Sequence, residues 1–206
     1  MNGILMKPWK VEAIADNPDR EWQTRRLSGL KEINKEPDKW SVVPAIMGDG
    51  FDFYVTTNLS AVLRIKPRYK VGELVYIKEA YYCPVSVWIE DHCEPDGRTF
   101  YKLDNPSLFS GYWKSPLFMP AWAARYFIRI TGVEAQRLQE ISIDDCKAEG
   151  IHGYTLAKGC LSDNPPDQRW NFIELWDTIN PKYPWNTNPW IFKYRFKLLD
   201  KKEAEG

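Results

Sequence analysis

The clearest hydrophobic pattern in the chain lies near its carboxyl end. Between residues 190 and 198, large apolar side chains alternate with positions that include Lys193 and Arg195. A period of two is typical of a strand with one buried face, so this stretch is predicted to be a half-buried β-strand. The stretch 126–133 alternates in the same way and predicts a further strand, whose inner face is Tyr126, Ile128 and Ile130.

Three segments carry the spacing or the end signals of α-helices. A first helix is predicted to begin near Pro8 and to stop at 17–19, an Asn-Pro-Asp sequence. The sequence 142–145 resembles a capping box and predicts a short helix over 143–149. A third helix is predicted to start at Asn164-Pro165. The buried positions expected in the first and third helices are Val11, Ile14 and Ala15, and Phe172, Trp176 and Ile179.

Short β-prone stretches and turn signals occupy much of the remaining chain. A Gly-Asp-Gly sequence at 48–50 precedes a predicted hairpin arm over 51–55. The Asp96-Gly97 dipeptide lies between 85–89 and 99–103, and it predicts a hairpin that joins those two stretches. Further strands are predicted at 4–6 and 74–79, and a polar, basic loop is predicted at 20–26.

This order of elements predicts an α+β fold. We expect a small, curved, mostly antiparallel sheet or barrel with flanking helices. A chain of 206 residues is long enough for one domain with a substantial core. The domain is expected to span 1–199, with hairpin insertions near 32–60 and 81–111 and a polar tail at 200–206.

Composition narrows the class of protein. Hydrophobic residues make up 44% and aromatic residues 15% of the chain, which is typical of a folded globular protein. No run of about 18 apolar residues occurs, and the amino terminus lacks the apolar core of a signal peptide, so we expect a cytoplasmic protein without a membrane partner. The four cysteines have no CxxC spacing, so no metal site is predicted, and because the chain has neither a P-loop nor a Rossmann fingerprint, no cofactor is predicted.

The charges are unevenly distributed, although 28 basic and 28 acidic residues leave no net charge. The stretches 20–31, 61–80 and 112–137 each carry three more basic than acidic residues, whereas 138–181 carries five more acidic residues. If the three basic stretches converge in the fold, they form a local anion site suited to nucleic acid, nucleotide or phosphate. The alternative is that each basic stretch is a solvated surface.

Four stretches in order resemble the ASCH domain of the PUA-like superfamily, in its phage and prophage form. The first combines residues 4–8 and 11–14 with Gln23-Thr24-Arg25-Arg26, and the second is 71–80. The third runs from Trp113 to Pro120 with Trp122 and Arg125, and continues through 137–142 and 149–151. The fourth combines 175–180 with Asn188-Pro189-Trp190. The resemblance covers nearly the whole chain and implies a PUA-like barrel.

The resemblance also implies a class of function. PUA-like domains mostly bind RNA or modified nucleobases, some ASCH proteins are similar to amidohydrolases acting on acetylated cytidine, and nuclease activity has been proposed for others. The family amidohydrolases use a Lys, a Thr and a Glu, which correspond here to Glu21, Thr24 and Arg129. Since Arg stays protonated and a Thr without a base is a weak nucleophile, the match to that activity is partial. A Glu21–Arg129 pair would preserve a contact with its charges reversed.

The first basic stretch holds the leading candidates for a binding site, because arginine presents a planar fork to phosphates and base edges. Glu79 is a candidate partner for an arginine and, with Thr24, a candidate catalytic residue. Trp22 and Trp113 are candidates for stacking on a base. The alternative for the charged residues is a structural ion-pair network. The predicted nucleic-acid-binding residues are Arg20, Gln23, Thr24, Arg25, Arg26, Lys78, Glu79, Trp113, Arg125 and Arg129.

The sequence therefore predicts a module that binds nucleic acid, above all RNA, or a modified nucleobase. Its partner is expected to be RNA, another single-stranded nucleic acid or a nucleoside. The alternative is an enzyme, either a hydrolase of modified pyrimidine nucleosides or a nuclease. A third hypothesis is a phage protein whose tryptophans contact other proteins.

Overall fold

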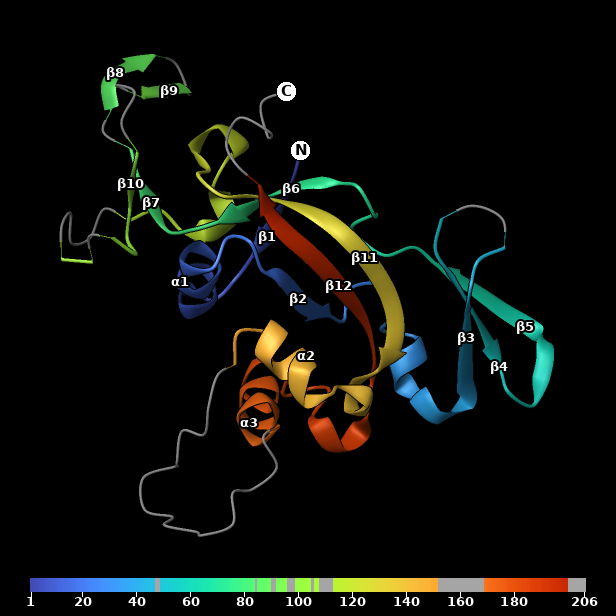
Figure 1. Ribbon diagram of the computed structural model, residues 1–206. Helices are drawn as coiled ribbons and strands as arrows, with labels where there is room; N and C mark the ends of the chain where they lie inside the picture. Colours follow the sequence, from blue (N-terminus) through green and yellow to red (C-terminus); the bar gives the residue numbers. More distant parts are fainter. Residues whose placement is uncertain are drawn as a thin grey trace, which may run out of the picture. The chain divides into compact units, whose positions relative to one another are not determined.

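The computed structural model describes residues 1–46, 49–83, 85–89, 92–95, 99–104, 106–107, 113–151 and 169–199. The α-helices are α1 (Pro8–Asp16), α2 (Ile143–Ala148) and α3 (Trp170–Ile179) (Figure 1). The strands are β1 (Asn2–Leu5), β2 (Glu21–Arg26), β3 (Trp40–Pro44), β4 (Phe51–Val55), β5 (Asn58–Ile65), β6 (Leu74–Lys78), β7 (Tyr81–Tyr82), β8 (Val85–Ile89), β9 (His92–Pro95), β10 (Phe100–Tyr101), β11 (Phe127–Arg137) and β12 (Trp190–Leu199).

The largest sheet is mixed, and the protein combines α and β structure as predicted. Its five strands are ordered β1-β6-β11-β12-β2. β1 runs parallel to β6, with Asn2 opposite Val75, whereas β11 runs antiparallel to β6. The parallel pair is possible because a long stretch of chain connects β1 to β6. Among the described strands the order is open, with β1 and β2 at its ends, so these strands do not close into a barrel.

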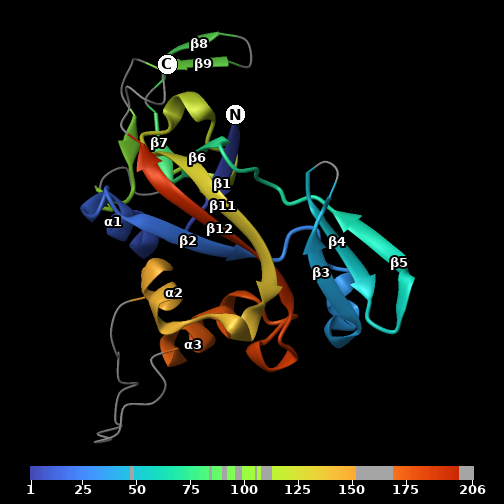
Figure 2. The same ribbon diagram turned by 45° about the vertical axis from the view of Figure 1, so that its right-hand side comes forward.

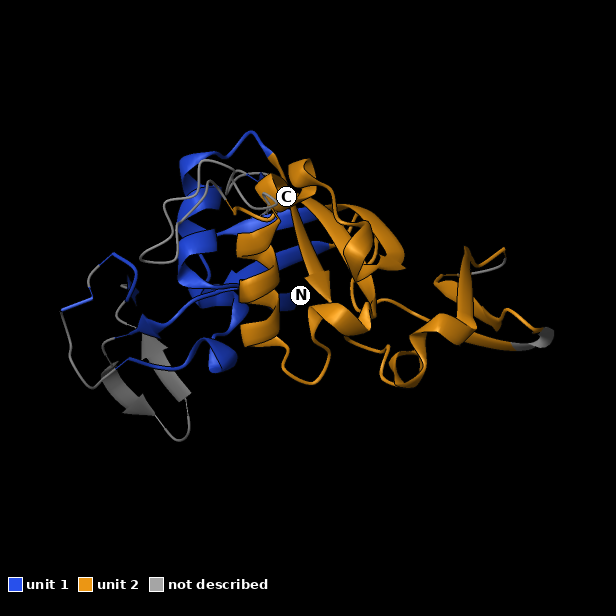
Figure 3. Ribbon diagram, turned by 90° about the horizontal axis from the view of Figure 1, so that it is seen from below, with its two compact units in different colours: residues 1–20, 74–129, 197–206 blue, residues 21–73, 130–196 orange. Residues whose placement is uncertain are grey.

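Contacts divide the chain into two compact units (Figure 3). Unit 1 comprises Met1–Arg20, Leu74–Arg129 and Lys197–Gly206, and unit 2 comprises Glu21–Glu73 and Ile130–Phe196. Both units are assembled from segments that are far apart in the sequence. No helix of the described chain has both the length and the apolar character needed to cross a bilayer.

Unit 1 buries the inner side chains of its strands and of α1. Ile77 of β6 and Ile128 of β11 have no exposed surface. α1 begins at Pro8, whose fixed φ suits a first helical turn, and it buries Val11 and Ile14 as predicted. A second group of buried side chains combines Tyr76 of β6 with Tyr81, Met119, Ala123 and Ala124.

Unit 2 has its core along β12, where the predicted alternation is confirmed. Phe192 and Tyr194 are fully buried, whereas Lys193 is only partly so. Ile191 is buried as well, because it packs in one cluster with Cys146 of α2 and Phe172 of α3. Figures 1 and 2 show α2 and α3 side by side. At its start, β12 is therefore buried on both faces.

Local signals at α2 act as the sequence predicts. The Ser142 hydroxyl accepts a hydrogen bond from the Asp145 amide, and the Asp145 carboxylate accepts one from the Ser142 amide. This reciprocal capping box satisfies amide groups that have no partner within the helix. Gly150 follows the helix with a φ of 85°, a conformation in which glycine is favoured.

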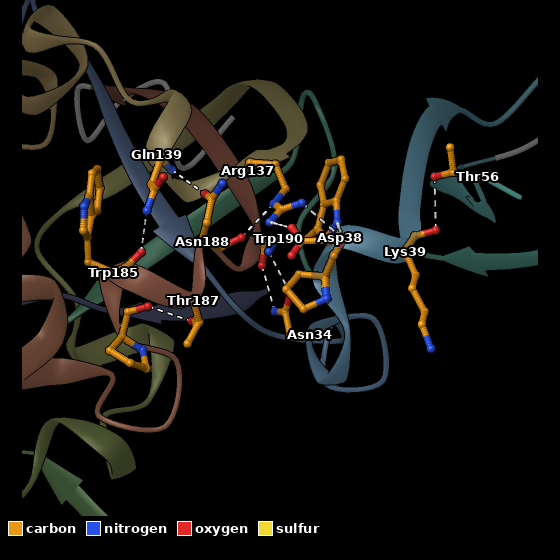
Figure 4. A network of polar contacts seen from close by, with 12 residues as sticks. Asn34, Asp38, Lys39, Thr56, Arg137, Gln139, Trp185, Thr187, Asn188 and Trp190 are labelled. Atoms are coloured by element: carbon orange, nitrogen blue, oxygen red, sulfur yellow. Dashed lines mark hydrogen bonds and ion pairs between the residues drawn. The ribbon is translucent and has the colours of Figure 1, made fainter.

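A network of hydrogen bonds and an ion pair holds the start of β12 in place within unit 2 (Figure 4). The Arg137 guanidinium donates to the carbonyl of Asn188 at 2.7 Å, to the carbonyl of Pro37 at 3.2 Å and to the Asp38 carboxylate at 2.7 Å. The Asn34 side chain accepts from the Trp190 amide at 2.7 Å. Arg137, which belongs to the basic stretch 112–137, is thus hydrogen-bonded to other residues of the fold.

The stretch 40–65 forms a separate three-stranded antiparallel sheet in unit 2. β4 lies between β3 and β5, so the hairpin arm predicted at 51–55 is confirmed. Phe53 of β4 is fully buried and meets the Trp190 ring edge to face, with ring centroids 5.4 Å apart.

Three predictions about local structure are wrong. Residues 21–26 form strand β2 rather than a loop. β8 pairs with β9 rather than with 99–103, because the shorter connection costs less loop-closure entropy. Ile179 is 44% exposed, since it is the last residue of α3. The predicted helix start at Asn164-Pro165 and the turn at Asp96-Gly97 lie outside the described residues.

Candidate functional site

β2 carries four of the ten residues predicted to bind nucleic acid, and much of it is buried. Trp22 has no exposed surface, Thr24 is 1% exposed and Arg25 is 4% exposed. Trp22 therefore packs in the core, where it cannot stack on a base. Gln23 is half-buried on the same strand, and Arg20 is half-buried at the end of the first segment of unit 1.

Arg25 lies in an ion-pair network within unit 2. Its guanidinium is 3.0 Å from the Asp145 carboxylate and 3.1 Å from the Glu149 carboxylate. It also lies 5.8 Å from the centroid of the Phe172 ring. Burial opposes ionisation of Asp145, but the Arg25 charge and the Ser142 amide outweigh burial and hold the pKa of Asp145 below its ordinary value. These contacts support the structural interpretation of Arg25.

Arg26 and Thr24 contact each other on β2. The Arg26 guanidinium donates to the Thr24 hydroxyl at 2.5 Å and to the Arg25 carbonyl at 2.9 Å. Burial lowers the pKa of Arg26, although the Glu149 carboxylate acts in the opposite direction. The Thr24 hydroxyl is thus hydrogen-bonded and inaccessible.

Glu21 and Arg129, which stand where the family amidohydrolases have a Lys and a Glu, belong to different units. Glu21, in unit 2, accepts a hydrogen bond from the Thr131 hydroxyl at 2.6 Å. Arg129, in unit 1, is exposed on β11. Their predicted pairing stays a prediction.

Unit 1 brings together two other predicted residues, Glu79 and Arg125. Both oxygens of the buried Glu79 carboxylate accept hydrogen bonds from Arg125, at 2.8 and 2.9 Å. Arg125 also donates to the Asp104 carboxylate at 2.5 Å. Its guanidinium carbon lies 4.1 Å from the ring centroid of Tyr101 and 4.7 Å from that of Tyr126. Such a bidentate, stacked arginine is fixed in orientation.

The electrostatics of this cluster follow from its burial. Burial by itself lowers the pKa of Arg125, but the hydrogen bonds to Glu79 and Asp104 outweigh it and raise that pKa above its ordinary value. Burial also raises the pKa of Tyr101 to about 12. Arg125 is therefore a permanent cation beside a neutral phenol.

Lys78 is held in place at the end of β6. Its ammonium donates to the Leu117 carbonyl at 2.9 Å and lies 5.7 Å from the centroid of the Tyr76 ring. Gly3 on the paired strand β1 makes room for both side chains, because a Cβ atom there would lie 2.6 Å from the Tyr76 ring. The absent side chain at Gly3 thus leaves room for the Lys78 and Tyr76 side chains to pack against β1.

A cavity of about 500 Å³ opens beside these residues, entirely within unit 1. Ligand pockets commonly measure about 300–1,000 Å³, so this one is large enough for a small organic molecule. Its wall is mainly apolar, and two lysines and two carboxylates supply the charge. The lining residues are Met6, Pro8, Val11, Glu12, Lys78, Glu79, Ala80, Lys102, Leu103, Pro106 and Pro116.

The chemistry of the lining suits a small organic ligand that has both apolar and charged groups. Lys78 and Lys102 offer ammonium donors, and the Glu79 charge is already balanced by Arg125. Met6, Val11 and the prolines offer apolar contact surface. Among the described residues, no group of three or more His, Cys, Asp or Glu side chains is arranged to hold a metal ion.

Sequence reasoning missed two exposed aromatic residues that follow the cavity-lining Pro116 in the chain. Phe118 is 75% exposed and Trp122 is 57% exposed, whereas the predicted stacking residue Trp113 is half-buried. The available signal was the pair Pro116 and Pro120, which restrict the backbone and favour an exposed turn over a core element.

Comparisons of this chain with models of known protein families, with curated proteins and with solved structures found no match.

Proposed function

We propose that the protein binds a nucleobase, either of RNA or of a modified nucleoside, in the unit 1 cavity. The observation that carries the proposal is the cavity itself, whose wall combines apolar side chains with Lys78, Lys102 and Glu79, and Arg125 holds the Glu79 carboxylate. A base needs apolar contact for its faces and a few fixed polar groups at its edges. The lysines are suited to the accompanying phosphate.

Further support comes from the residues that the sequence singles out. Lys78 and Glu79 line the cavity, and Arg125 is bonded to Glu79. The resemblance to the ASCH domain implies the same class of ligand. The proposal therefore keeps the predicted ligand and places it in unit 1 rather than at β2.

The alternative hydrolase function has less support. A catalytic Thr needs an accessible hydroxyl and a neighbouring base, but the Thr24 hydroxyl is buried against the Arg26 guanidinium. Both oxygens of the Glu79 carboxylate already accept hydrogen bonds from Arg125, so this carboxylate is occupied by a contact within the protein.

Two variants test the proposal in different ways. Ala80→Phe is designed to fill the cavity and keep every charge, whereas Lys102→Ala removes one charge and keeps the cavity. We would measure binding of fluorescein-labelled single-stranded RNA, single-stranded DNA and duplex, and of UMP and AMP, across a salt series. Lys182→Ala, at an exposed lysine of unit 2, is the matched control.

The expected result is that Ala80→Phe abolishes binding of the mononucleotide and weakens binding of the single strand. Lys102→Ala should lower the salt slope for a single strand by about 0.7, the value for one lost phosphate contact. Lys182→Ala should behave as wild type. If Ala80→Phe folds, by circular dichroism, and binds as wild type does, the cavity is not the site.

A further inference from the structure

Phe118 and Trp122 are held outward by a firmly anchored segment. They lie on two consecutive 3-10 turns, Pro116–Phe118 and Ala121–Ala123. Between and beside them, Met119 and Ala123 are each 1% exposed in the buried cluster of unit 1. The Tyr76 hydroxyl donates to the Met119 carbonyl at 3.0 Å, and the Tyr101 hydroxyl donates to the Ala123 carbonyl at 2.9 Å.

The buried residues and hydrogen bonds of this segment keep the two rings away from the core. Because Met119 and Ala123 are buried and their carbonyls are hydrogen-bonded, the segment holds the Phe118 and Trp122 side chains at the surface. A large apolar side chain that stays exposed gives up the stabilisation that its burial would supply. Adjacent exposed apolar residues are typical of an interaction surface, and Leu117, which is 56% exposed, adds to this one.

Two lysines lie near the Phe118 end of this segment. Lys78 donates to the carbonyl of Leu117, the residue before Phe118. Lys114 lies 5.8 Å from the ring centroid of Tyr81, whose hydroxyl donates to the Phe118 carbonyl at 3.4 Å. Exposed rings beside lysines favour a partner with flat aromatic groups on an anionic backbone.

The turn also adjoins the cavity. Pro116 and Lys78 belong both to the cavity lining and to the contacts of this turn. Four residues of extended chain span about 14 Å at most, so the Cα atoms of Phe118 and Trp122 lie within that distance of each other. This separation suits neighbouring nucleotides rather than remote sites.

We propose that Phe118 and Trp122 form a stacking surface for the bases that neighbour the one in the cavity, so that the ligand is a single-stranded nucleic acid rather than a free nucleoside. This inference rests on the proposed function. Lys78 and Lys114 then contact the phosphates that connect the bases.

The test separates the aromatic ring from its apolar area. Phe118→Leu removes the ring and keeps much of the apolar surface, whereas Phe118→Tyr keeps the ring. Trp122→Leu is the second variant, and Trp170→Leu, at a 48% exposed tryptophan on α3, is the matched control. The probes are fluorescein-labelled decamers of uridine, adenosine and thymidine, together with UMP and AMP.

We expect Phe118→Leu and Trp122→Leu each to weaken binding of a decamer by about 5- to 160-fold, which corresponds to a stacking contribution of about 1–3 kcal/mol per base. Phe118→Tyr and Trp170→Leu should retain wild-type affinity. Mononucleotide binding should be unchanged in all four variants, because the cavity is intact. The RNA and DNA decamers distinguish the two sources of single strand.

Three results would overturn the inference. If the decamers bind wild type, Phe118→Leu and Trp122→Leu equally, the rings do not stack on bases, and the cavity proposal stands on the mononucleotide data. If wild type binds neither decamers nor mononucleotides at low salt, the proposed function fails with it. Self-association that requires Phe118, with no change in decamer affinity, would identify a protein-binding surface instead.

Discussion

Arg25→Ala should destabilise the protein rather than impair a surface binding site. The Arg25 side chain is 1% exposed, and it pairs with Asp145 and Glu149, whose side chains are 17% and 10% exposed. Removing one partner of a buried ion pair costs about 3–5 kcal/mol, because it leaves the other charge buried and unpaired. For a chain of this size, that loss corresponds to roughly 6–20 °C in melting temperature.

The loss of stability in Arg25→Ala should depend on pH in a defined direction. The pKa of Asp145 is below its ordinary value in the folded protein, so its ion pair contributes stability above that value. The contribution disappears as the pH falls through the folded pKa. The difference between wild type and Arg25→Ala should therefore be full at pH 7 and smaller below about pH 4, near the ordinary pKa of Asp.

The assay is urea and thermal unfolding followed by tryptophan fluorescence and circular dichroism. Arg64→Ala is the matched control, because Arg64 pairs with Asp52 at the surface and its loss should leave the midpoint unchanged. The double variant Arg25→Met with Glu149→Gln should recover part of the loss, since it removes one of the stranded charges. If Arg25→Ala is as stable as Arg64→Ala, the network has been assigned wrongly.

Two further predictions follow from contacts and burial. Gly3→Ala should lower the free energy of unfolding, measured in urea, by roughly 1–3 kcal/mol, because the new Cβ displaces the Tyr76 ring. A variant as stable as wild type would mean that Tyr76 and Lys78 move freely. Burial raises the pKa of the Cys146 thiol to about 11, so iodoacetamide at pH 8 should alkylate Cys146 only in urea. Peptide mass spectrometry measures this directly, and rapid alkylation of Cys146 in the native protein would contradict its burial.

Features set by neighbouring residues were predictable from the sequence. The period of two identifies β12, Pro8 identifies the start of α1, and the capping box of α2 involves residues three apart. Each signal acts over a few positions, so no knowledge of the tertiary structure is needed.

Features set by distant partners were not predictable. β2 has polar side chains, yet it is buried because Arg25 meets Glu149, 124 residues away. The cavity combines residues from four separate segments, among them Glu12, Lys102 and Pro116. No local sequence pattern predicts that residues so far apart in the chain come into contact. Glu79 and Arg125 were both identified as candidates, whereas their bidentate pairing required the fold.

The central claim is that nucleic acid binds at the unit 1 cavity, and photo-crosslinking tests it most directly. A uridine decamer with 4-thiouridine at an internal position would be irradiated on the full-length protein, and crosslinked peptides would be mapped by mass spectrometry. The account predicts crosslinks within 78–80, 102–103 and 116–122. Crosslinks confined to 21–26, the strand that the sequence alone favours, would contradict it.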